Sequence, residues 1–376
     1  MKKILYITTI PSPYRVAYFN ELGKKCDLTV LFEKSESDER DATWKQYSFV
    51  NFKGIVLPGK RLSVNTAFCP SILKYLKISW DEIVCCDVST LTGMLAIQYM
   101  KIKKIKYWIE GDGAFAKSGK GCKEKIKRHF ISGAHGYFST SKLLDEYYAT
   151  YGADVNKIKR YMFSSILNCK IIDLGGGAVA QQIEKRESLR IKARRELEID
   201  ENNIIILTVG RFIHIKGFDI LLHAAKLLDQ KLNFYFVGGL PTDEYQTICT
   251  NDKLKNVYFE GFKDSNTLAK YYMAADMFVL PTRADVWGLV INEAMAYALP
   301  VITTTKCIAG LEMVKDKING YLVEPDNAVD LADRINKLAI SRDLRNRFAI
   351  NAKNTGKLYT IESMVESHSL LFMEEV

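Results

Sequence analysis

Short runs of β-branched and apolar residues alternate along the chain with stretches in which apolar residues recur every three to four positions. The runs predict strands, and the 3.6-residue period predicts helices, as in residues 15–25 and 89–101. Strands and helices that alternate in this way predict an α/β protein with parallel sheets and crossover helices on both faces. The predicted strands are residues 3–9, 27–33, 82–88, 105–111 and 136–140, then 204–210, 232–239, 256–261, 277–282 and 299–304.

The chain has 376 residues, which is too long for one typical core, so we expect two domains. A glycine triplet at 175–177, followed by a highly charged helical run, is typical of a linker and a surface helix. The predicted organisation is an N-terminal domain over 1–170, a linker over 171–190, a C-terminal domain over 191–358 and a C-terminal helix over 359–376.

The composition is ordinary for a globular protein, with 48% hydrophobic and 26% charged residues. No run of 18 apolar residues occurs, and the first residues do not have the form of a signal peptide, so we expect a cytoplasmic protein. The eight cysteines and five histidines show no CxxC pair and no zinc-ligand spacing. We therefore expect free thiols and no metal site.

The charge is uneven. Residues 1–168 carry 27 basic and 16 acidic side chains, a net charge of +11, whereas residues 169–376 carry 26 and 28, a net charge of −2. This asymmetry predicts that the first half meets something anionic: a membrane surface, a lipid phosphate or a nucleic acid.

The most basic segment is "KSGKGCKEKIKRHFI", residues 117–131. Its spacing is not that of a P-loop, and no helix-turn-helix, RNP or zinc signature accompanies it, so we do not expect nucleic-acid binding. A helix with Lys123, Lys125, Lys127 and Arg128 fits an anionic membrane surface or a lipid diphosphate. The alternative is a basic helix that is simply solvated.

Ligands of open parallel sheets bind outside the carboxyl ends of the strands. After the strand 204–210, Arg211 stands at the strand end and Lys216 precedes Gly217, where the next helix begins. Two such cations can hold a diphosphate, although exposed surface charges are the commoner interpretation of any single charged loop.

The stretch "RADVWGLVINEAMAYALPVITT", residues 283–304, supports the ligand interpretation. A helix that begins at Gly288–Leu289 offers unpaired backbone N–H groups and a positive dipole end to a phosphate. Glu293 lies about one turn further along among apolar residues, where its carboxylate can reach the vicinal hydroxyls of a ribose.

These segments, together with "VYFEGF" and "NGYLVEPDNAVDLADRI", resemble in order and spacing the C-terminal domain of the family-4 retaining glycosyltransferases over about residues 200–340. The resemblance implies the GT-B fold, in which two Rossmann-like domains face each other across a cleft. It also implies closure of the two domains about the linker and a C-terminal helix that returns to the first domain.

The same resemblance implies roles for individual residues. The family's acidic motif is Glu, seven residues, Glu, and here it runs from Asp285 to Glu293. Glu293 would bind the ribose, and Asp285, one methylene shorter than the usual residue, would contact the transferred sugar. The departing diphosphate would be stabilised by Arg211 and Lys216, and the donor site would be completed by Gly210, Gly288 and Leu289. Trp287 would either pack or contact the sugar.

In the first half, "TTIPSPYRVAYFNEL" resembles a subgroup with Pro-Tyr-Arg at this turn that is associated with capsule and exopolysaccharide assembly. The resemblance places Ser12, Tyr14 and Arg15 in the cleft. Glu110 and Asp112 lie at the carboxyl end of a predicted strand and are candidates to hold an acceptor hydroxyl or the donor sugar; acidic residues in such loops also serve turn chemistry.

The sequence thus predicts a metal-independent retaining glycosyltransferase without a cofactor. We expect it to move a sugar from a nucleotide diphosphate, a UDP-sugar before GDP-mannose, to a lipid-linked saccharide at the inner face of the membrane. Three alternatives remain: a sugar-nucleotide 2-epimerase, a sugar phosphorylase, and a non-catalytic subunit that binds nucleotide sugar or lipid for a partner. The Arg211/Lys216 and Asp285/Glu293 pattern favours the transferase.

Overall fold

The computed structural model describes residues 1–35, 48–116, 119 and 121–373, and the chain forms two compact units. The first consists of residues 1–165 together with the segment that begins at Thr360, and the second of residues 166–359. The glycine-rich interval expected to be a linker is not a bare connection, because helix α6 (Val179–Glu196) begins inside it and packs on α9 (Ser265–Ala274) of the second unit.

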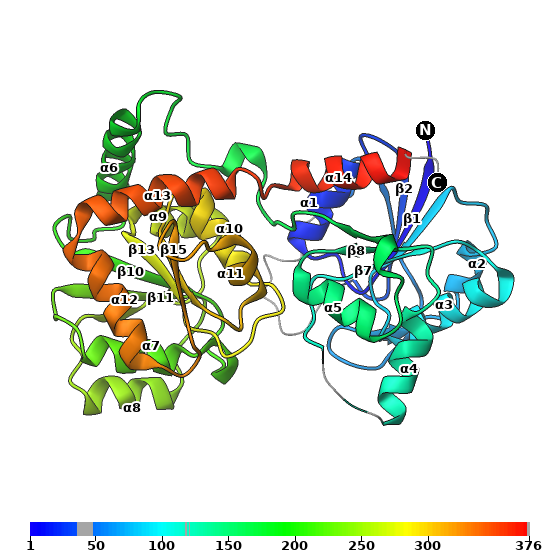
Figure 1. Ribbon diagram of the computed structural model, residues 1–376, viewed down its shortest axis with the longest axis horizontal. Coiled ribbons are helices and arrows are strands. Elements are labelled where there is room, and N and C mark those ends of the chain that lie inside the picture. Colours follow the sequence, from blue (N-terminus) through cyan, green and yellow to red (C-terminus); the bar gives the residue numbers. More distant parts are fainter. Residues whose placement is uncertain (36–47, 117–118, 120, 374–376) are drawn as a thin grey trace. The chain divides into compact units, whose positions relative to one another are not determined.

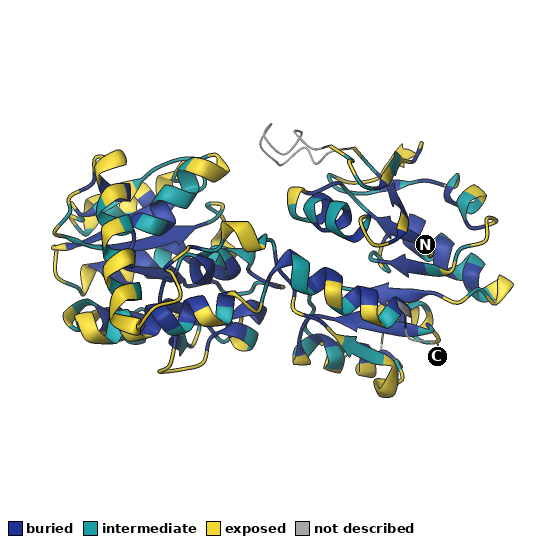
Figure 2. Ribbon diagram, turned by 90° about the horizontal axis from the view of Figure 1, so that it is seen from above, coloured by how far each residue is buried: buried dark blue, intermediate teal, exposed yellow. Residues whose placement is uncertain are grey.

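The first unit is built on a parallel seven-stranded sheet in the order β3-β2-β1-β6-β7-β8-β9. Its inner strands are buried along most of their length, as expected for a parallel sheet covered on both faces, whereas the two edge strands contain no buried residue (Figure 2). The strands are β1 (Lys3–Thr8), β2 (Asp27–Phe32), β3 (Lys53–Val56), β6 (Glu82–Cys85), β7 (Trp108–Glu110), β8 (Gly136–Ser139) and β9 (Ile158–Arg160). A short antiparallel pair is added by β4 (Lys60–Arg61) and β5 (Ala67–Phe68).

Helices cover this sheet, and they include the segment from the end of the chain. Figure 1 shows α14 beside α1, and the two helices are in contact. The helices are α1 (Pro13–Leu22), α2 (Ile72–Tyr75), α3 (Leu91–Lys103), α4 (Cys122–Ile131), α5 (Lys142–Thr150) and α14 (Ile361–Met373). Among the described residues, no helix is long and apolar enough to cross a membrane.

The second unit has a parallel six-stranded sheet in the order β12-β11-β10-β13-β14-β15. Its core is formed by apolar side chains of the strands and of α7 and α12, among them Phe218, Phe234 and Ile335. The strands are β10 (Ile204–Val209), β11 (Leu232–Val237), β12 (Val257–Phe259), β13 (Met277–Leu280), β14 (Val301–Thr304) and β15 (Gly320–Val323). The helices besides α6 and α9 are α7 (Phe218–Lys226), α8 (Asp243–Asn251), α10 (Leu289–Ala296), α11 (Ile308–Met313), α12 (Ala328–Ile340) and α13 (Arg342–Gly356).

The charged helix α6 was expected at the surface, but it buries arginine side chains. Arg194 is fully buried, and its Nη2 donates to Asp276 Oδ2 at 2.6 Å, while its other nitrogens donate to the carbonyls of Ala274 and Asn203. Asp276 Oδ2 also accepts from the backbone N–H of Ile205 at 2.8 Å. This buried pair attaches α6 to the amino ends of β10 and β13.

Removing this guanidinium should be costly because it leaves the buried Asp276 with less compensation. We expect Arg194→Met to lower the free energy of unfolding by about 3–5 kcal/mol. The neighbouring Arg195, whose side chain is 69% exposed and pairs with Glu201, provides the control, and Arg195→Met should have little effect. Urea unfolding followed by circular dichroism measures both; equal losses would contradict a structural role for the buried pair.

Candidate functional site

The order of strands in each sheet creates one position where neighbouring connections leave in opposite directions. In the second unit this position lies between β10 and β13, and in the first between β1 and β6. Ligands of such sheets bind there, outside the carboxyl ends of the strands. Most of the candidate residues proposed from the sequence follow β10, β13 or β1, while Glu110 ends β7 and Asp112 follows it.

In the second unit, the candidate residues meet around an ion pair. Lys216 Nζ lies 2.5 Å from Asp285 Oδ2, and both side chains are mostly buried. A Cβ atom placed on Gly210 would lie 3.8 Å from Lys216 Cε, so the lysine stem passes close to the end of β10. A Cβ atom on Gly288 would lie 3.6 Å from Asp285 Oδ2. The structure therefore brings Gly210, Lys216, Asp285 and Gly288 together, while the adjoining Arg211 is exposed.

Two glycines are required by this geometry. Gly217, which begins α7, has φ +67°, and a Cβ atom there would lie 2.1 Å from the carbonyl oxygen of Pro281. Gly288, the N-cap of α10, has φ +98°, and a Cβ atom would lie 2.7 Å from Cys307 Sγ. Both positions combine a left-handed backbone with a close neighbour, which only glycine accommodates. They allow the two loops to approach each other at the start of α10.

Arg283, which the sequence analysis did not single out, fixes the loop after β13. Its guanidinium binds Asp219 at the start of α7 through two hydrogen bonds of 2.9 and 2.6 Å, and its Nε donates to Asp326 at 2.6 Å. The Arg283 backbone N–H donates to Ile215 at 2.8 Å. On the other side, the N–H of Asp285 donates to the carbonyl of Lys306. Lys216 and Asp285 thus stand on loops that are held together independently of their own ion pair.

Glu293 lies on α10 next to two tyrosines. The Tyr272 hydroxyl donates to Glu293 Oε2 at 2.8 Å, and the Tyr297 ring stacks on that of Tyr272 with an interplanar angle of 2°. Burial and the Glu293 charge raise the pKa of Tyr272 well above its usual value, so this phenol stays protonated and donates. The hydrogen bond orients a half-buried carboxylate on the helix that begins at Gly288.

Trp287 had two interpretations, and the structure favours packing. Its side chain is almost fully buried, and its Nε1–H donates to Asn292 Oδ1 at 2.8 Å.

In the first unit, a cavity of about 330 Å³ lies at the carboxyl ends of β1 and β6. Four of the five candidate residues line it, namely Ser12, Tyr14, Arg15 and Asp112. The fifth, Glu110, is not among its lining residues; its side chain is fully buried and contacts Arg15 and Tyr161. Glu110 is thus placed to position Arg15 and not to contact a ligand.

Arg15 holds two carboxylates in this region. Its Nη1 lies 2.5 Å from Glu110 Oε1, and its Nη2 pairs with Asp112 Oδ1. Tyr14 OH donates to the other oxygen of Asp112 at 3.0 Å. Burial opposes ionisation of Glu110, but the Arg15 guanidinium and His368 together outweigh it and lower the pKa of Glu110 to about 2. His368 of α14 also contributes, since its Nε2 lies 3.7 Å from Glu110 Oε2.

Asp87 is a cavity residue that sequence reasoning missed. It follows β6 as Asp112 follows β7, and this position at a strand end was the available signal. Burial, together with the nearby charges of Glu33 and Asp112, raises the pKa of Asp87 to about 7. A carboxyl group with this pKa exchanges its proton near neutral pH.

The raised pKa means that the ionised form of Asp87 destabilises the folded protein. Because the pKa of Asp87 is higher in the folded than in the unfolded chain, the free energy of unfolding falls as the pH rises from about 4 to about 7. We therefore expect Asp87→Asn to raise the Tm more at pH 8 than at pH 5, as measured by scanning calorimetry. An equal change at both pH values would contradict the raised pKa.

The described residues contain no group of three or more His, Cys, Asp and Glu side chains placed to hold a metal ion. The cysteines are free thiols. The basic segment is only partly described, since Lys117, Ser118 and Lys120 of the 117–131 interval lie outside the described residues.

Comparison with solved structures shows the fold class. Anabaena Alr3699/HepE in complex with UDP superposes with a TM-score of 0.77 at 17% identity, over 98% of this chain and 99% of that one. The same protein in complex with UDP-glucose gives a TM-score of 0.73. This structural similarity and the two parallel sheets confirm the GT-B fold expected from the sequence.

Residues 190–355 match the family model described as Glycosyl transferases group 1, and this region of the chain belongs to that family. A relative from Klebsiella pneumoniae, an uncharacterized 41.2 kDa protein in the cps region, is 35% identical over 40% of this chain and 41% of its own length. The O-antigen chain mannosyltransferase C of Escherichia coli is 24% identical over 59% of this chain and 58% of its own length. The chain thus spans less than two thirds of these relatives.

Proposed function

We propose that this protein is a retaining glycosyltransferase that moves a sugar from a nucleoside diphosphate to a saccharide acceptor. The observation that carries the proposal is the placement of Lys216 and Asp285 beside Gly288, where α10 begins. A cation and the backbone N–H groups of a helix start are preorganised donors for a diphosphate, on which negative charge grows as the glycosidic bond breaks. Arg211, exposed at the end of β10, adds a second cation.

In this proposal the nucleoside lies along α10, and Glu293, oriented by Tyr272, accepts hydrogen bonds from the ribose hydroxyls. Asp285 lies at the boundary of phosphate and sugar. Because Asp285 pairs with Lys216, a diphosphate must take over the ammonium group and leave the carboxylate to the sugar hydroxyls. The leaving phosphate takes the acceptor proton during attack on the same face, so no divalent ion or enzyme nucleophile is required.

The acceptor is assigned to the cavity of the first unit. Tyr14, Asp87 and Asp112 line it and supply the hydroxyl and carboxyl groups that hold saccharides. Asn65 also lines the cavity, and its buried Oδ1 has no hydrogen-bond partner among the described residues. An acceptor hydroxyl would satisfy this atom, which supports a polar ligand here.

We favour a UDP-sugar as donor, because HepE, a protein of the same fold, is solved with UDP and with UDP-glucose. GDP-mannose is the second candidate, because the Escherichia coli relative is named a mannosyltransferase. The Klebsiella relative comes from a cps region, which supports a lipid-linked acceptor in the assembly of a cell-surface polysaccharide.

Nucleotide binding tests the donor site. With UDP, GDP, ADP and dTDP compared by thermal shift, we expect one diphosphate at 100 times its Kd to stabilise the wild type by about 2.7 kcal/mol, equally with Mg²⁺ and with EDTA. Lys216→Met and Glu293→Gln should each weaken this binding at least ten-fold, because each removes a hydrogen bond to a charged group. Asp285→Asn should bind the diphosphate as tightly as wild type and lose transfer.

Lys226→Met is the matched control. Lys226 is also a lysine of the second unit, but it belongs to α7, and its Nζ lies 2.6 Å from Asp252 Oδ1 and not beside Asp285. It should leave nucleotide binding unchanged. If none of the four diphosphates stabilises the wild type, the donor site is wrongly assigned.

We further propose that α4 attaches the protein to the cytoplasmic face of an anionic membrane. Lys127 and Arg128 turn toward their own unit, where Lys127 lies over the Tyr151 ring and Arg128 donates to the carbonyl of Thr150. Lys123, Lys125 and the apolar Ile126 are exposed together. Exposed lysines around an apolar side chain fit an anionic lipid surface.

Sedimentation with lipid vesicles tests this attachment. The protein should bind vesicles that contain phosphatidylglycerol and not vesicles of phosphatidylcholine alone, and Lys123→Glu with Lys125→Glu should abolish binding at 0.1 M salt. The same double charge reversal at Lys185 and Lys192 of α6 serves as the control. If both double variants bind equally, α4 does not attach the protein to lipid.

A further inference from the structure

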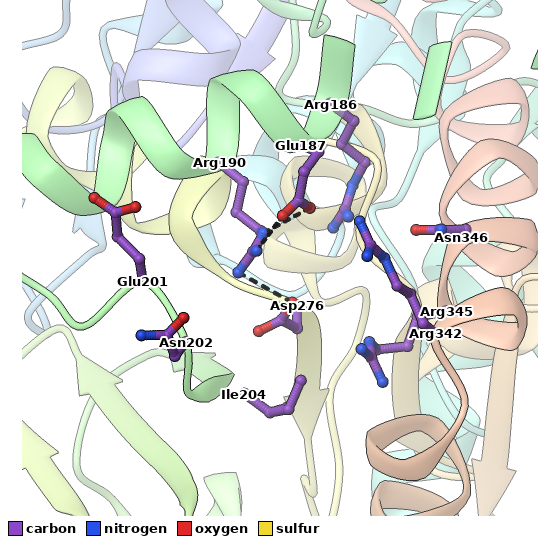
Figure 3. Close-up of a pocket in the computed structure, with 10 residues that line it drawn as sticks. All are labelled: Arg186, Glu187, Arg190, Glu201, Asn202, Ile204, Asp276, Arg342, Arg345 and Asn346. Carbon is purple, nitrogen blue, oxygen red and sulfur yellow. Dashed lines mark hydrogen bonds and ion pairs between the residues drawn. The ribbon is translucent and has the colours of Figure 1, made fainter. Parts of the chain in front are cut away.

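A second cationic site lies in the same unit as the donor residues but at the other end of its sheet. A pocket of about 200 Å³ is lined by residues of α6, of the first turn of α13, and of the segments that enter β10 and β13 (Figure 3). Ile204 begins β10 here, whereas Gly210 follows the end of the same strand. A strand of six residues separates the two sites by about 20 Å.

The carboxylates of this pocket are already paired. Glu187 binds Arg190, whose Nη1 also lies 3.6 Å from Asp276 Oδ1. Asp276 has Arg194 as its closer partner, and Glu201 binds Arg195 at 2.6 Å. Figure 3 shows Arg190 between Glu187 and Asp276. Each acidic group of the pocket therefore has an arginine of its own.

Three arginines remain without an ion-pair partner within the described residues: Arg186, Arg342 and Arg345. Arg186 is buried and donates only to the backbone carbonyls of Ala298 and Ala275. Arg345 donates from Nη1 to the carbonyls of Leu338 and Ala339 at the end of α12. In Figure 3 the guanidinium groups of Arg186 and Arg345 point toward each other from α6 and α13.

Like charges held this close repel one another. Burial is the main cause that lowers the pKa of Arg186 to about 10; the charges of Arg190 and Arg345 add to the lowering, and those of Asp276 and Glu187 oppose it. Burial likewise lowers the pKa of Arg345, helped by the charges of Arg190 and Arg342 and opposed by that of Asp276. An anion among the three guanidinium groups would replace this repulsion by charge-assisted hydrogen bonds.

The chemistry of the pocket indicates which anion fits. Arg342, Arg345 and Asn346 all belong to the first turn of α13, a helix of 15 residues whose amino end carries positive dipole charge. A guanidinium group can bind two phosphate oxygens at once. Three guanidinium groups also match the charge of a phosphate dianion better than they match the single charge of a carboxylate ligand. The volume admits one small group and not a nucleotide.

We propose that this pocket, formed by Arg186, Arg342, Arg345 and Asn346, is a phosphate-binding site separate from the donor site. Its ligand is a phosphate group, carried either by inorganic phosphate or by a phosphomonoester.

Arg342 is the residue to change, because it is exposed and makes no ion pair within the described part of the chain, whereas Arg186 and Arg345 also hold backbone carbonyls. Isothermal titration of the full chain with inorganic phosphate, at constant ionic strength in chloride, should show binding by the wild type. Arg342→Gln should weaken it at least ten-fold. Arg347→Gln should not, since Arg347 is exposed on the same helix but is not among the pocket's lining residues.

Lys216→Met separates this site from the donor site and should retain phosphate binding. Loss of binding in Lys216→Met but not in Arg342→Gln would place phosphate at the donor site and overturn the proposal, as would equal affinity in the wild type and Arg342→Gln. A parallel titration with glycerol 3-phosphate identifies the source: tighter binding than inorganic phosphate indicates a phosphomonoester, and weaker binding the free ion.

Discussion

Arg283 ties together three segments that meet at the carboxyl end of the second sheet. Arg283 itself belongs to the loop after β13. Its two hydrogen bonds to Asp219 hold the start of α7, and its hydrogen bond to Asp326 holds the loop after β15. A planar guanidinium is suited to this task because its donors have fixed directions. The neighbouring Lys216 and Asp285 can exchange partners without loosening the loops that bear them.

In both units, paired basic and acidic side chains lie at the carboxyl ends of strands. In the first unit, Arg15 and two carboxylates form a buried group behind a cavity, and in the second a lysine and an aspartate face each other beside a helix start. The lysine–aspartate pair depends on close backbone approach at Gly217 and Gly288, whereas the strands beneath supply mainly buried apolar side chains. Stability and chemistry therefore reside in different residues, as is usual for open parallel sheets.

The sequence predicted ten of the strands, and it did not predict β3, β4, β5, β9 and β15. These strands have two to four residues each, and β3 and β9 contain no buried residue, so no apolar run distinguishes them from loops. The donor residues were predictable because they follow strands in order along the chain. Asp87 and Arg283 occupy similar positions at strand ends but had been given no role: Asp87 falls inside a predicted strand, and Arg283 is the first residue of the 283–304 stretch.

Other features depend on contacts between distant segments. Nothing near His368 in the chain indicates that its ring lies against Glu110, and nothing in the charged run of α6 distinguishes the buried Arg194 from the exposed Arg195. Burial of an arginine is decided by what packs over it, which for Arg194 is the strand end at Asp276, 82 residues away. Local patterns do not contain this information.

The position of α14 affects the order in which the chain can fold as it is synthesised. Its residues complete the first unit, with His368 and Phe372 packed on Phe138 of β8, yet they are made after the whole of the second unit. A nascent chain can therefore finish the second unit while the first still lacks a helix that covers α1 and β8. Although domains made first usually fold first, here the N-terminal unit is the last to be completed.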